Sequence, residues 1–155
     1  MYVTSVPGGD RIPVSIVLVK ESDFKKITKK RYFFNWKIEK SYTVYKLEIR
    51  DEKDILGLIS IDIIEEEKRI EIRLIAVAKE QVGIYKTIDR IAGNLFAFAA
   101  RLAIKKFGVR AAVSLIPKTS LRKYYMNKYG FEQAGNNIFL EGKSLSNIIK
   151  NYDDE

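Results

Sequence analysis

The chain has 155 residues, the size of one ordinary domain, and with 46% hydrophobic and 31% charged residues it is neither a disordered tail nor a membrane protein. Twenty-eight basic and 20 acidic residues give a net charge of +8, which favours acidic partners without selecting one. The absence of cysteine and histidine excludes disulfides, Cys- or His-ligated metal sites and Ser-His or Cys-His catalysis, so no metal site is expected.

The first half of the chain predicts one strand, one helix and three further strands. Residues 14–19 read as the first strand, and the acidic residues Glu21 and Asp23 open a helix predicted over 24–36, because negative charge stabilises a helix N-terminus. Three segments rich in β-branched residues follow, at 42–50, 55–65 and 69–77. Their charged connections are too short for crossover helices, so these three strands should form an antiparallel meander.

The second half begins with the strongest helix of the sequence, predicted over 90–107, where apolar residues recur at helical spacing and Gly108 follows as a stop. The remaining elements are a strand at 111–116, a helix at 120–129, paired strands at 131–134 and 137–141, and a final helix at 144–152. The order β-α-β-β-β-α-β-α-β-β is α+β. No linker or repeat interrupts it, so residues 1–155 are predicted to form a single domain.

Three stretches of sequence carry a resemblance to a known family. The strand at 69–77 ends in Leu74-Ile75-Ala76-Val77, the long helix begins Arg90-Ile91-Ala92-Gly93-Asn94, and a later helix runs into Tyr129-Gly130-Phe131. With the order of elements, they resemble the GNAT superfamily of N-acetyltransferases over about residues 12–140. The resemblance implies a GNAT-like fold with a central mixed, mostly antiparallel sheet flanked by helices. It also implies acetyl-CoA as co-substrate and transfer of its acetyl group to an amine by direct attack.

The resemblance assigns residues to acetyl-CoA binding. Backbone groups of Ile75 and Val77 would bind the pantetheine arm, although their side chains are equally expected to pack in the core. The amides of Ile91, Ala92, Gly93 and Asn94 would bind the pyrophosphate, since a helix N-terminus presents partial positive charge. The alternative for this stretch is a helix that simply begins with small residues.

The pyrophosphate loop departs from the family's pattern. Arg90 stands where the family has glycine, and Thr87 stands where it has arginine or glutamine. Lys86 and Arg90 would compensate by adding positive charge at the phosphates, or the side chain of Arg90 would obstruct them. The connection over 79–89 is also longer than is typical of the family.

Acetyl transfer needs a base for the amine and an acid for the departing thiolate. The family's usual tyrosine lies four residues before the glycine of Gly-Phe, a position held here by Met126, so the neighbouring Tyr125 is the candidate acid. Its alternative is a structural tyrosine packed on the core. Glu71 is the candidate base, and its alternative is a solvent-exposed position, because it alternates with apolar residues along its strand.

A basic cluster at residues 25–31 precedes the aromatic residues Tyr32, Phe33, Phe34 and Trp36. Exposed lysines and rings would bind the phosphates and bases of a single-stranded nucleic acid, and a tRNA substrate would fit the same charge. In the alternative, Phe24, Ile27 and Phe34 face the core and the lysines are merely solvated.

Two functions therefore stand beside N-acetyl transfer: a GNAT-like CoA-binding or interaction module with weakened catalysis, and a nucleic-acid-binding domain that uses the basic helix. The amine acceptor is open, and a homodimer is an alternative to a monomer. The first ten residues lack the features of a signal peptide, and no apolar run is long enough to span a bilayer. We therefore expect a soluble, cytoplasmic protein without a membrane partner.

Overall fold

The computed structural model describes residues 1–153, so residues 154 and 155 of the predicted domain lie outside the described residues. The chain groups into two compact units. The first unit comprises residues 1–60 and 74–95, and the second comprises residues 61–73 and 96–153. The single domain stays a prediction.

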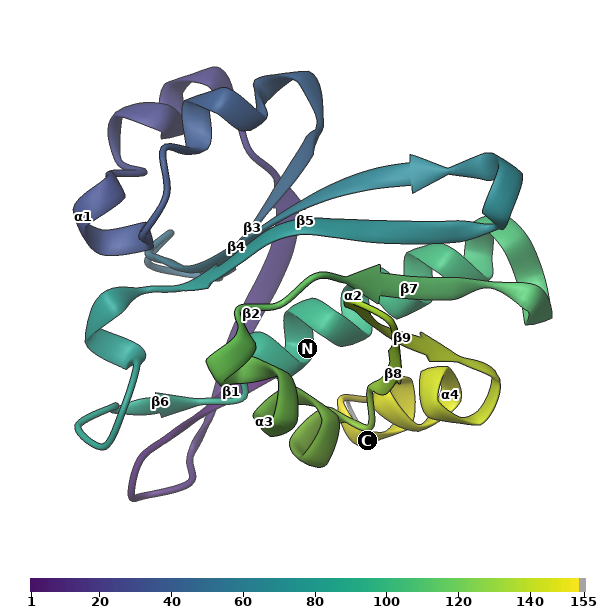
Figure 1. Ribbon diagram of the computed structural model, residues 1–155. Helices are drawn as coiled ribbons and strands as arrows, with labels where there is room; N and C mark the ends of the chain where they lie inside the picture. The colour runs from purple at the N-terminus through teal and green to yellow at the C-terminus, as the bar shows by residue number, and fades with distance from the viewer. Residues whose placement is uncertain (154–155) are drawn as a thin grey trace. The chain divides into compact units, whose positions relative to one another are not determined.

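Nine strands are hydrogen-bonded in the order β6-β1-β2-β3-β4-β5-β7-β9-β8 (Figure 1). They are β1 (Tyr2–Ser5), β2 (Arg11–Leu18), β3 (Thr43–Ile49), β4 (Ile55–Ile64), β5 (Arg69–Val77), β6 (Ile88–Asp89), β7 (Ala112–Leu115), β8 (Glu132–Ala134) and β9 (Asn137–Glu141). β5 and β7 are parallel, whereas β1–β2, β1–β6, β2–β3, β7–β9 and β8–β9 are antiparallel. The predicted α+β class, with a mixed and mostly antiparallel sheet, is confirmed.

Four α-helices accompany the strands: α1 (Lys29–Tyr32), α2 (Ile91–Phe107), α3 (Thr119–Tyr129) and α4 (Gly142–Asn151). Five short 3-10 helices complete the described chain: η1 (Glu21–Lys25), η2 (Trp36–Ser41), η3 (Glu65–Glu67), η4 (Lys79–Gln81) and η5 (Gly108–Arg110). The predicted meander corresponds to β3, β4 and β5, which are neighbours in the sheet, and the predicted long helix corresponds to α2.

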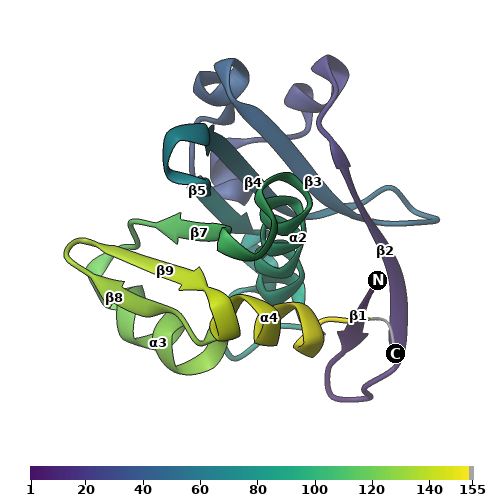
Figure 2. The same ribbon diagram turned by 90° about the vertical axis from the view of Figure 1, so that its right-hand side faces the viewer.

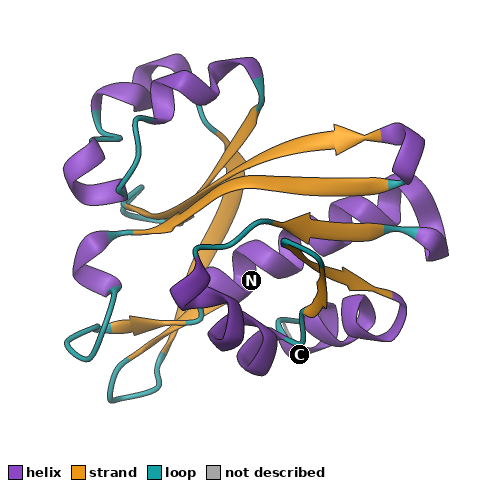
Figure 3. Cartoon of the chain, in the orientation of Figure 1, coloured by secondary structure: helices purple, strands orange, loops and turns teal. Residues whose placement is uncertain are grey.

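The single helix predicted over 24–36 is wrong. Three short helices, η1, α1 and η2, replace it (Figure 3). Thr28 caps α1 by accepting a hydrogen bond from the Arg31 amide, and Phe33 ends the helix in the left-handed conformation, with φ 72°. The breaks allow Ile27, Tyr32 and Trp36 to reach one core cluster, although their spacing is not that of one helix face.

In the first unit, β1 and β6 were not predicted, because four and two residues give too little pattern to recognise a strand. β1 pairs with both β2 and β6. Gly57 in β4 allows the start of α2 to approach closely, since a Cβ there would lie 2.9 Å from Ile91 Cγ2 and 3.2 Å from the Ala76 carbonyl oxygen. The N-terminus of α2 is thereby packed beside the end of β5.

In the second unit, β7 lies between β5 and β9. Gly130 ends α3 with φ 81°, a left-handed conformation that glycine adopts readily. α4 packs against β9 and buries Leu145 and Ile148 (Figure 2). The buried ring of Phe96 contacts the rings of Tyr125 and Tyr129 of α3 and of Phe131.

Candidate functional site

The strand β5 continues past the end of its parallel partner. Its register with β7 runs from Arg69 opposite Ala112 to Ile72 opposite Leu115, where β7 ends. β5 continues for five more residues to Val77. The backbone of this extension is therefore not paired with β7.

The two residues predicted to bind the pantetheine arm, Ile75 and Val77, lie on this extension. Both are half-buried, whereas Ala76 between them belongs to the buried core cluster. Because side chains alternate along a strand, Ile75 and Val77 point to the face opposite Ala76. Their side chains are thus only partly packed against other residues, and their backbone groups lie beyond the part of β5 that pairs with β7.

The start of α2 presents backbone donors. The Asn94 amide donates to the Arg90 carbonyl at 3.2 Å, the first hydrogen bond of the helix. The preceding amides of Ile91, Ala92 and Gly93 lie in the first turn, where a helix offers no acceptor of its own. These three are the donors predicted for a pyrophosphate, whereas the amide of Asn94, the fourth residue predicted, is engaged in the helix.

Arg90 immediately precedes the helix and holds an unusual backbone conformation. Its φ of 76° lies in the left-handed region that favours glycine, the residue that the family pattern has here. Its guanidinium lies 4.4 Å from the centre of the Tyr2 ring, and Arg11 lies 4.2 Å from the same ring. The side chain of Arg90 is therefore held against β1 by a cation–π contact.

A carboxylate also lies at this helix end. Asp89 Oδ1 accepts a hydrogen bond from the Arg90 amide at 2.9 Å and forms an ion pair with Lys86 Nζ at 3.1 Å. The positive charge predicted from Lys86 is thus balanced locally. The first-turn amides of α2 add the partial positive charge of a helix N-terminus at this end.

The side chain of Asn94 has a structural role that was not predicted from the sequence. Its side chain is fully buried, and Nδ2 donates to the carbonyl oxygens of Tyr2 at 2.9 Å and Arg90 at 2.7 Å. It therefore ties β1 to the start of α2. One signal in the sequence indicates this role: Asn94 stands in an otherwise apolar helical stretch, and a buried amide side chain requires polar partners.

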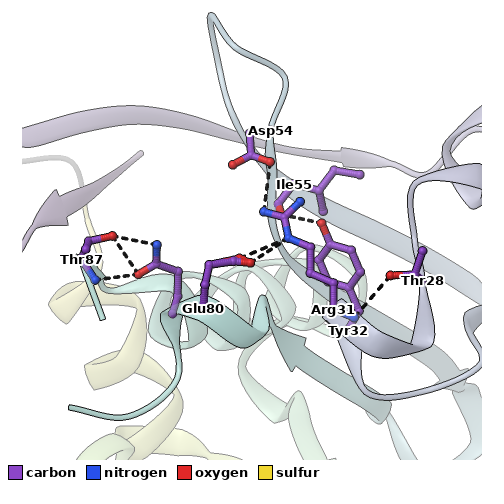
Figure 4. A network of polar contacts seen from close by, with 8 residues as sticks. Thr28, Arg31, Tyr32, Asp54, Ile55, Glu80 and Thr87 are labelled. Carbon is purple, nitrogen blue, oxygen red and sulfur yellow. Dashed lines mark hydrogen bonds and ion pairs between the residues drawn. The ribbon is translucent and has the colours of Figure 1, made fainter. Parts of the chain in front are cut away.

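The long connection between β5 and α2 is fixed at both of its ends. Arg31 of α1 donates to Glu80 Oε1 at 2.8 Å and to Asp54 Oδ1 at 3.1 Å (Figure 4). Burial alone would lower the pKa of Arg31, but the hydrogen bonds to Glu80 and Asp54 outweigh it and raise the pKa. Gln81 Oε1 accepts from the Thr87 amide at 2.8 Å. Between these anchors, residues 82–85 form an exposed tip.

Tyr125, the candidate acid, packs in an aromatic cluster of α2 and α3. Its ring contacts Phe96 edge-on, with centroids 5.3 Å apart, and also contacts Tyr124, Tyr129 and Phe131. Burial, with a smaller contribution from Tyr124, raises the pKa of Tyr125. The side chain therefore stays protonated at neutral pH, as an acid must, while its packing equally fits the structural alternative.

Glu71, the candidate base, is half-buried on β5. Arg69 Nη1 lies 3.5 Å from Glu71 Oε1 and donates to Ser114 Oγ at 2.7 Å. Alternation along β5 places Glu71 on the same face as Ile75 and Val77. The side chain is 26% exposed, so it is less exposed than the solvent-exposed alternative predicts.

Two of the four aromatic residues of the predicted nucleic-acid surface are buried. Tyr32 and Trp36 are buried in the core, where the Tyr32 hydroxyl donates to the Ile55 carbonyl at 2.8 Å. Lys29 and Lys30 are exposed. Ile27 is buried in the core cluster, and Phe24 and Phe34 pack against it, as the alternative predicted. Stacking of bases on the buried rings of Tyr32 and Trp36 is excluded. A nucleic-acid partner for the exposed lysines stays a prediction.

Within residues 1–153, no group of three or more acidic side chains has the arrangement to hold a metal ion. In the same part of the chain, no helix has the length and apolar character needed to cross a membrane.

No family model matches the sequence, and no curated protein matches it. Solved structures do match. A mutant form of the spermidine/spermine N-acetyltransferase SpeG from Vibrio cholerae shares 12% identity, with 90% of this chain and 98% of that chain covered and a TM-score of 0.63. The ribosomal-protein-S18-alanine N-acetyltransferase from Escherichia coli shares 12% identity over 82% of this chain and 91% of that one, with a TM-score of 0.58.

A third similar structure is a mutant of the toxin AtaT bound to the C-terminus of the antitoxin AtaR and acetyl-CoA. It shares 14% identity over 87% of this chain and 97% of that chain, with a TM-score of 0.61. At these identities the likeness establishes the fold. The chain has the GNAT acetyltransferase fold, as its sequence predicted.

Proposed function

We propose that the chain is an acetyl-CoA-dependent N-acetyltransferase that acts in the cytoplasm on an amine-bearing substrate. The observation that carries this proposal is the extension of β5 beyond its register with β7, on which Ile75 and Val77 lie. A strand edge that continues past its parallel neighbour offers amide and carbonyl groups to an extended, amide-containing ligand such as pantetheine. The shared fold supports the same assignment.

The start of α2 fits a pyrophosphate. The amides of Ile91, Ala92 and Gly93 would supply donors, and Arg90, which stands where the family has glycine, holds a left-handed backbone conformation that glycine favours. Asp89 opposes this fit through its negative charge, while Lys86 offsets that charge at 3.1 Å. Acetyl-CoA would supply the acetyl group as an activated thioester.

We assign the proton transfers to Glu71 and Tyr125. Glu71 takes a proton from the attacking amine, either directly or through a water molecule. As the new carbon–nitrogen bond forms and the carbon–sulfur bond breaks, the Tyr125 hydroxyl donates a proton to the departing sulfur. Glu71 then returns its proton to solvent and Tyr125 regains one, so both groups are reset for the next turnover.

The first test is release of free CoA from acetyl-CoA in the presence of an amine panel. The panel should include polyamines and peptides with an N-terminal alanine, the acceptor chemistries named for two similar structures. Tyr125→Phe should lower kcat by about a hundredfold or more, the usual contribution of a positioned acid. Tyr124→Phe is the matched control and should retain activity, because Tyr124 is a more exposed neighbour on the same helix.

The second test addresses binding. Gly93→Asp places a carboxylate at the proposed pyrophosphate site and should weaken CoA affinity about tenfold or more. Asn127→Asp, an exposed position on α3, makes the same charge change and should leave affinity unaltered. Equal affinity of the folded Gly93→Asp protein and the wild type would refute this site. Binding without CoA release by any amine would instead favour the CoA-binding or interaction module.

A further inference from the structure

Arg69 lies beside Glu71 in the second unit, where β5 and β7 pair in parallel (Figure 1). Both side chains lie on one face of β5, because side chains alternate along a strand. The register places Ser114 of β7 directly opposite Glu71, so its side chain belongs to the same face. An arginine, a carboxylate and a hydroxyl therefore meet at the candidate base.

The guanidinium of Arg69 is fixed by partners on two other elements. Nη1 donates to Ser114 Oγ at 2.7 Å, and Nε donates to Glu67 Oε2 of η3. Ser114 is only 5% exposed, so this partner belongs to the packed sheet. Burial alone would lower the pKa of Arg69, but its contacts with Glu67 and Glu71 outweigh burial and raise the pKa. The planar group is therefore charged and held at two of its nitrogen atoms.

This fixed guanidinium faces the carboxylate of Glu71. Arg69 Nη1, the atom that donates to Ser114, lies 3.5 Å from Glu71 Oε1. The side chains of Arg69 and Glu71 are 24% and 26% exposed, so water and salt screen their attraction less than that of a pair on the surface. The exposed part of Glu71 still leaves the side chain accessible to an amine or a water molecule.

The neighbouring strands offer Glu71 no other cation. β4 and β7, which flank β5, contain no basic residue, and the one ionisable residue of β4 is Asp62. In these three strands the cations are therefore Arg69 and Arg73, both in β5. Arg73 is exposed, whereas Arg69 is anchored by Ser114.

We infer that Arg69 is a positioning residue for Glu71. Anchored by Ser114, its guanidinium holds the carboxylate in the orientation that accepts a proton from the amine. Its effect on acetyl transfer passes entirely through Glu71. The inference rests on the proposed function, because it concerns the base of that reaction. A purely structural arginine would instead tie β5 to β7 and η3 without affecting the base.

A double-mutant cycle on CoA release tests this role. Arg69→Gln should lower kcat about tenfold, because a misplaced base loses part of a contribution of about a hundredfold or more. KM for acetyl-CoA should change by less than about twofold, since Arg69 binds no substrate. In a Glu71→Gln background the same substitution should change kcat by less than about twofold. Arg110→Gln, which removes an exposed arginine of η5, is the matched control and should retain the wild-type kcat.

Two further variants separate positioning from stability of the sheet. Ser114→Ala removes the anchor without changing any charge, so kcat should fall about threefold, and only while Glu71 is present. Arg69→Lys keeps the charge but not the planar fork, so it should lose less activity than Arg69→Gln. Urea denaturation of each variant shows that the protein compared with the wild type is folded.

The possible outcomes distinguish this inference from the proposed function. A wild-type protein that releases no CoA with any amine would refute the proposed function and the role of Arg69 with it. An active wild type would overturn the inference alone if Glu71→Gln or Arg69→Gln kept its kcat. The same holds if Arg69→Gln lost as much activity in the Glu71→Gln background as in the wild type. If Arg69→Gln does not fold, Ser114→Ala and Arg69→Lys decide in the same way.

Discussion

The amide side chain of Asn94 joins two segments that are 92 residues apart in sequence, through its bonds to Tyr2 and Arg90. Asn94→Ala removes both bonds and leaves the carbonyls of the half-buried residues Tyr2 and Arg90 with fewer donors. We expect the free energy of unfolding to fall by about 1 to 3 kcal/mol in urea denaturation. Asn127→Ala, an exposed control on α3, should change it by less than about 0.5 kcal/mol. A wild-type unfolding midpoint for Asn94→Ala would contradict the role assigned to this residue.

Asp23 Oδ2 lies 3.0 Å from Lys46 Nζ, and the contribution of this buried ion pair to stability depends on pH. Burial would raise the pKa of Asp23, but hydrogen bonds from the Lys20 amide and Lys46 outweigh it and lower the pKa below the usual 3.8. The folded state therefore holds this proton less tightly than the unfolded state. The resulting stabilisation is complete above about pH 4 and is lost as the pH falls through the folded pKa.

Denaturation of Asp23→Asn across pH values from about 6 to 2 measures this contribution. The variant should be less stable than the wild type at pH 6, and the difference in unfolding free energy should shrink as the pH falls. Ser22→Ala, an exposed and non-titrating neighbour, should show a difference that does not vary with pH. If the difference in unfolding free energy between Asp23→Asn and the wild type did not vary with pH, the pKa of Asp23 would be the same in the folded and unfolded states, which contradicts the lowered pKa.

At the scale of elements, the β5–α2 connection is a loop fixed at its ends with a free tip. Ile84 and Tyr85 are 89% and 87% exposed, whereas Gln81 accepts from the amides of Thr87 and Ile88 at 2.8 and 2.9 Å. Chymotrypsin should therefore cleave first after Tyr85. Gln81→Ala should accelerate this cut, because the loop loses the bonds that close it.

Mass spectrometry of the early fragments identifies the cut, and its rate is compared among variants. Lys79→Ala changes an exposed residue of the same 3-10 helix and should leave the rate unaltered. A first cut elsewhere, or equal rates for Gln81→Ala and the wild type, would contradict the closure of the loop by Gln81.

The elements that could be predicted from sequence are those specified locally. β3, β4 and β5 alternate strongly and are joined by short connections, and α2 has a long helical period. The single helix predicted over 24–36 is wrong because the apolar residues of this segment are placed by the core that they fill and do not follow one helix period. β1 and β6 depend on pairing with each other, an interaction that a local pattern does not contain.

The candidate site divides in the same way. Ile75 and Val77 belong to one short stretch of sequence and the residues at 91–93 to another, so each could be recognised from a local motif. The Arg31–Glu80 contact joins residues 49 positions apart, and the ion pair between Asp23 and Lys46 joins η1 to β3, so neither has a local signature. The pattern of residues 42–50 predicts a strand, but nothing nearby in sequence indicates that Asp23 of η1 pairs with Lys46.

For the whole molecule, the net charge of +8 complicates any test of acetyl-CoA binding, since a polyanion is attracted without a specific site. A ligand that binds only the folded state raises the free energy of unfolding by about 2.7 kcal/mol at about 100 times its Kd. We expect this gain from acetyl-CoA in urea denaturation. Part of this gain in unfolding free energy should persist at about 0.5 M NaCl, because salt strongly screens only the contacts between exposed charges.

ATP is the appropriate control, because it carries a polyphosphate and an adenine but no pantetheine arm. If β5 binds that arm, acetyl-CoA should stabilise the protein well beyond ATP at equal concentration, and the excess should survive added salt. Gly93→Asp should reduce the stabilisation by acetyl-CoA at the phosphate end. If both ligands stabilised the protein equally and salt abolished both effects, the binding would be explained by the attraction of a basic protein for polyanions. An acetyl-CoA site on β5 would then have no support.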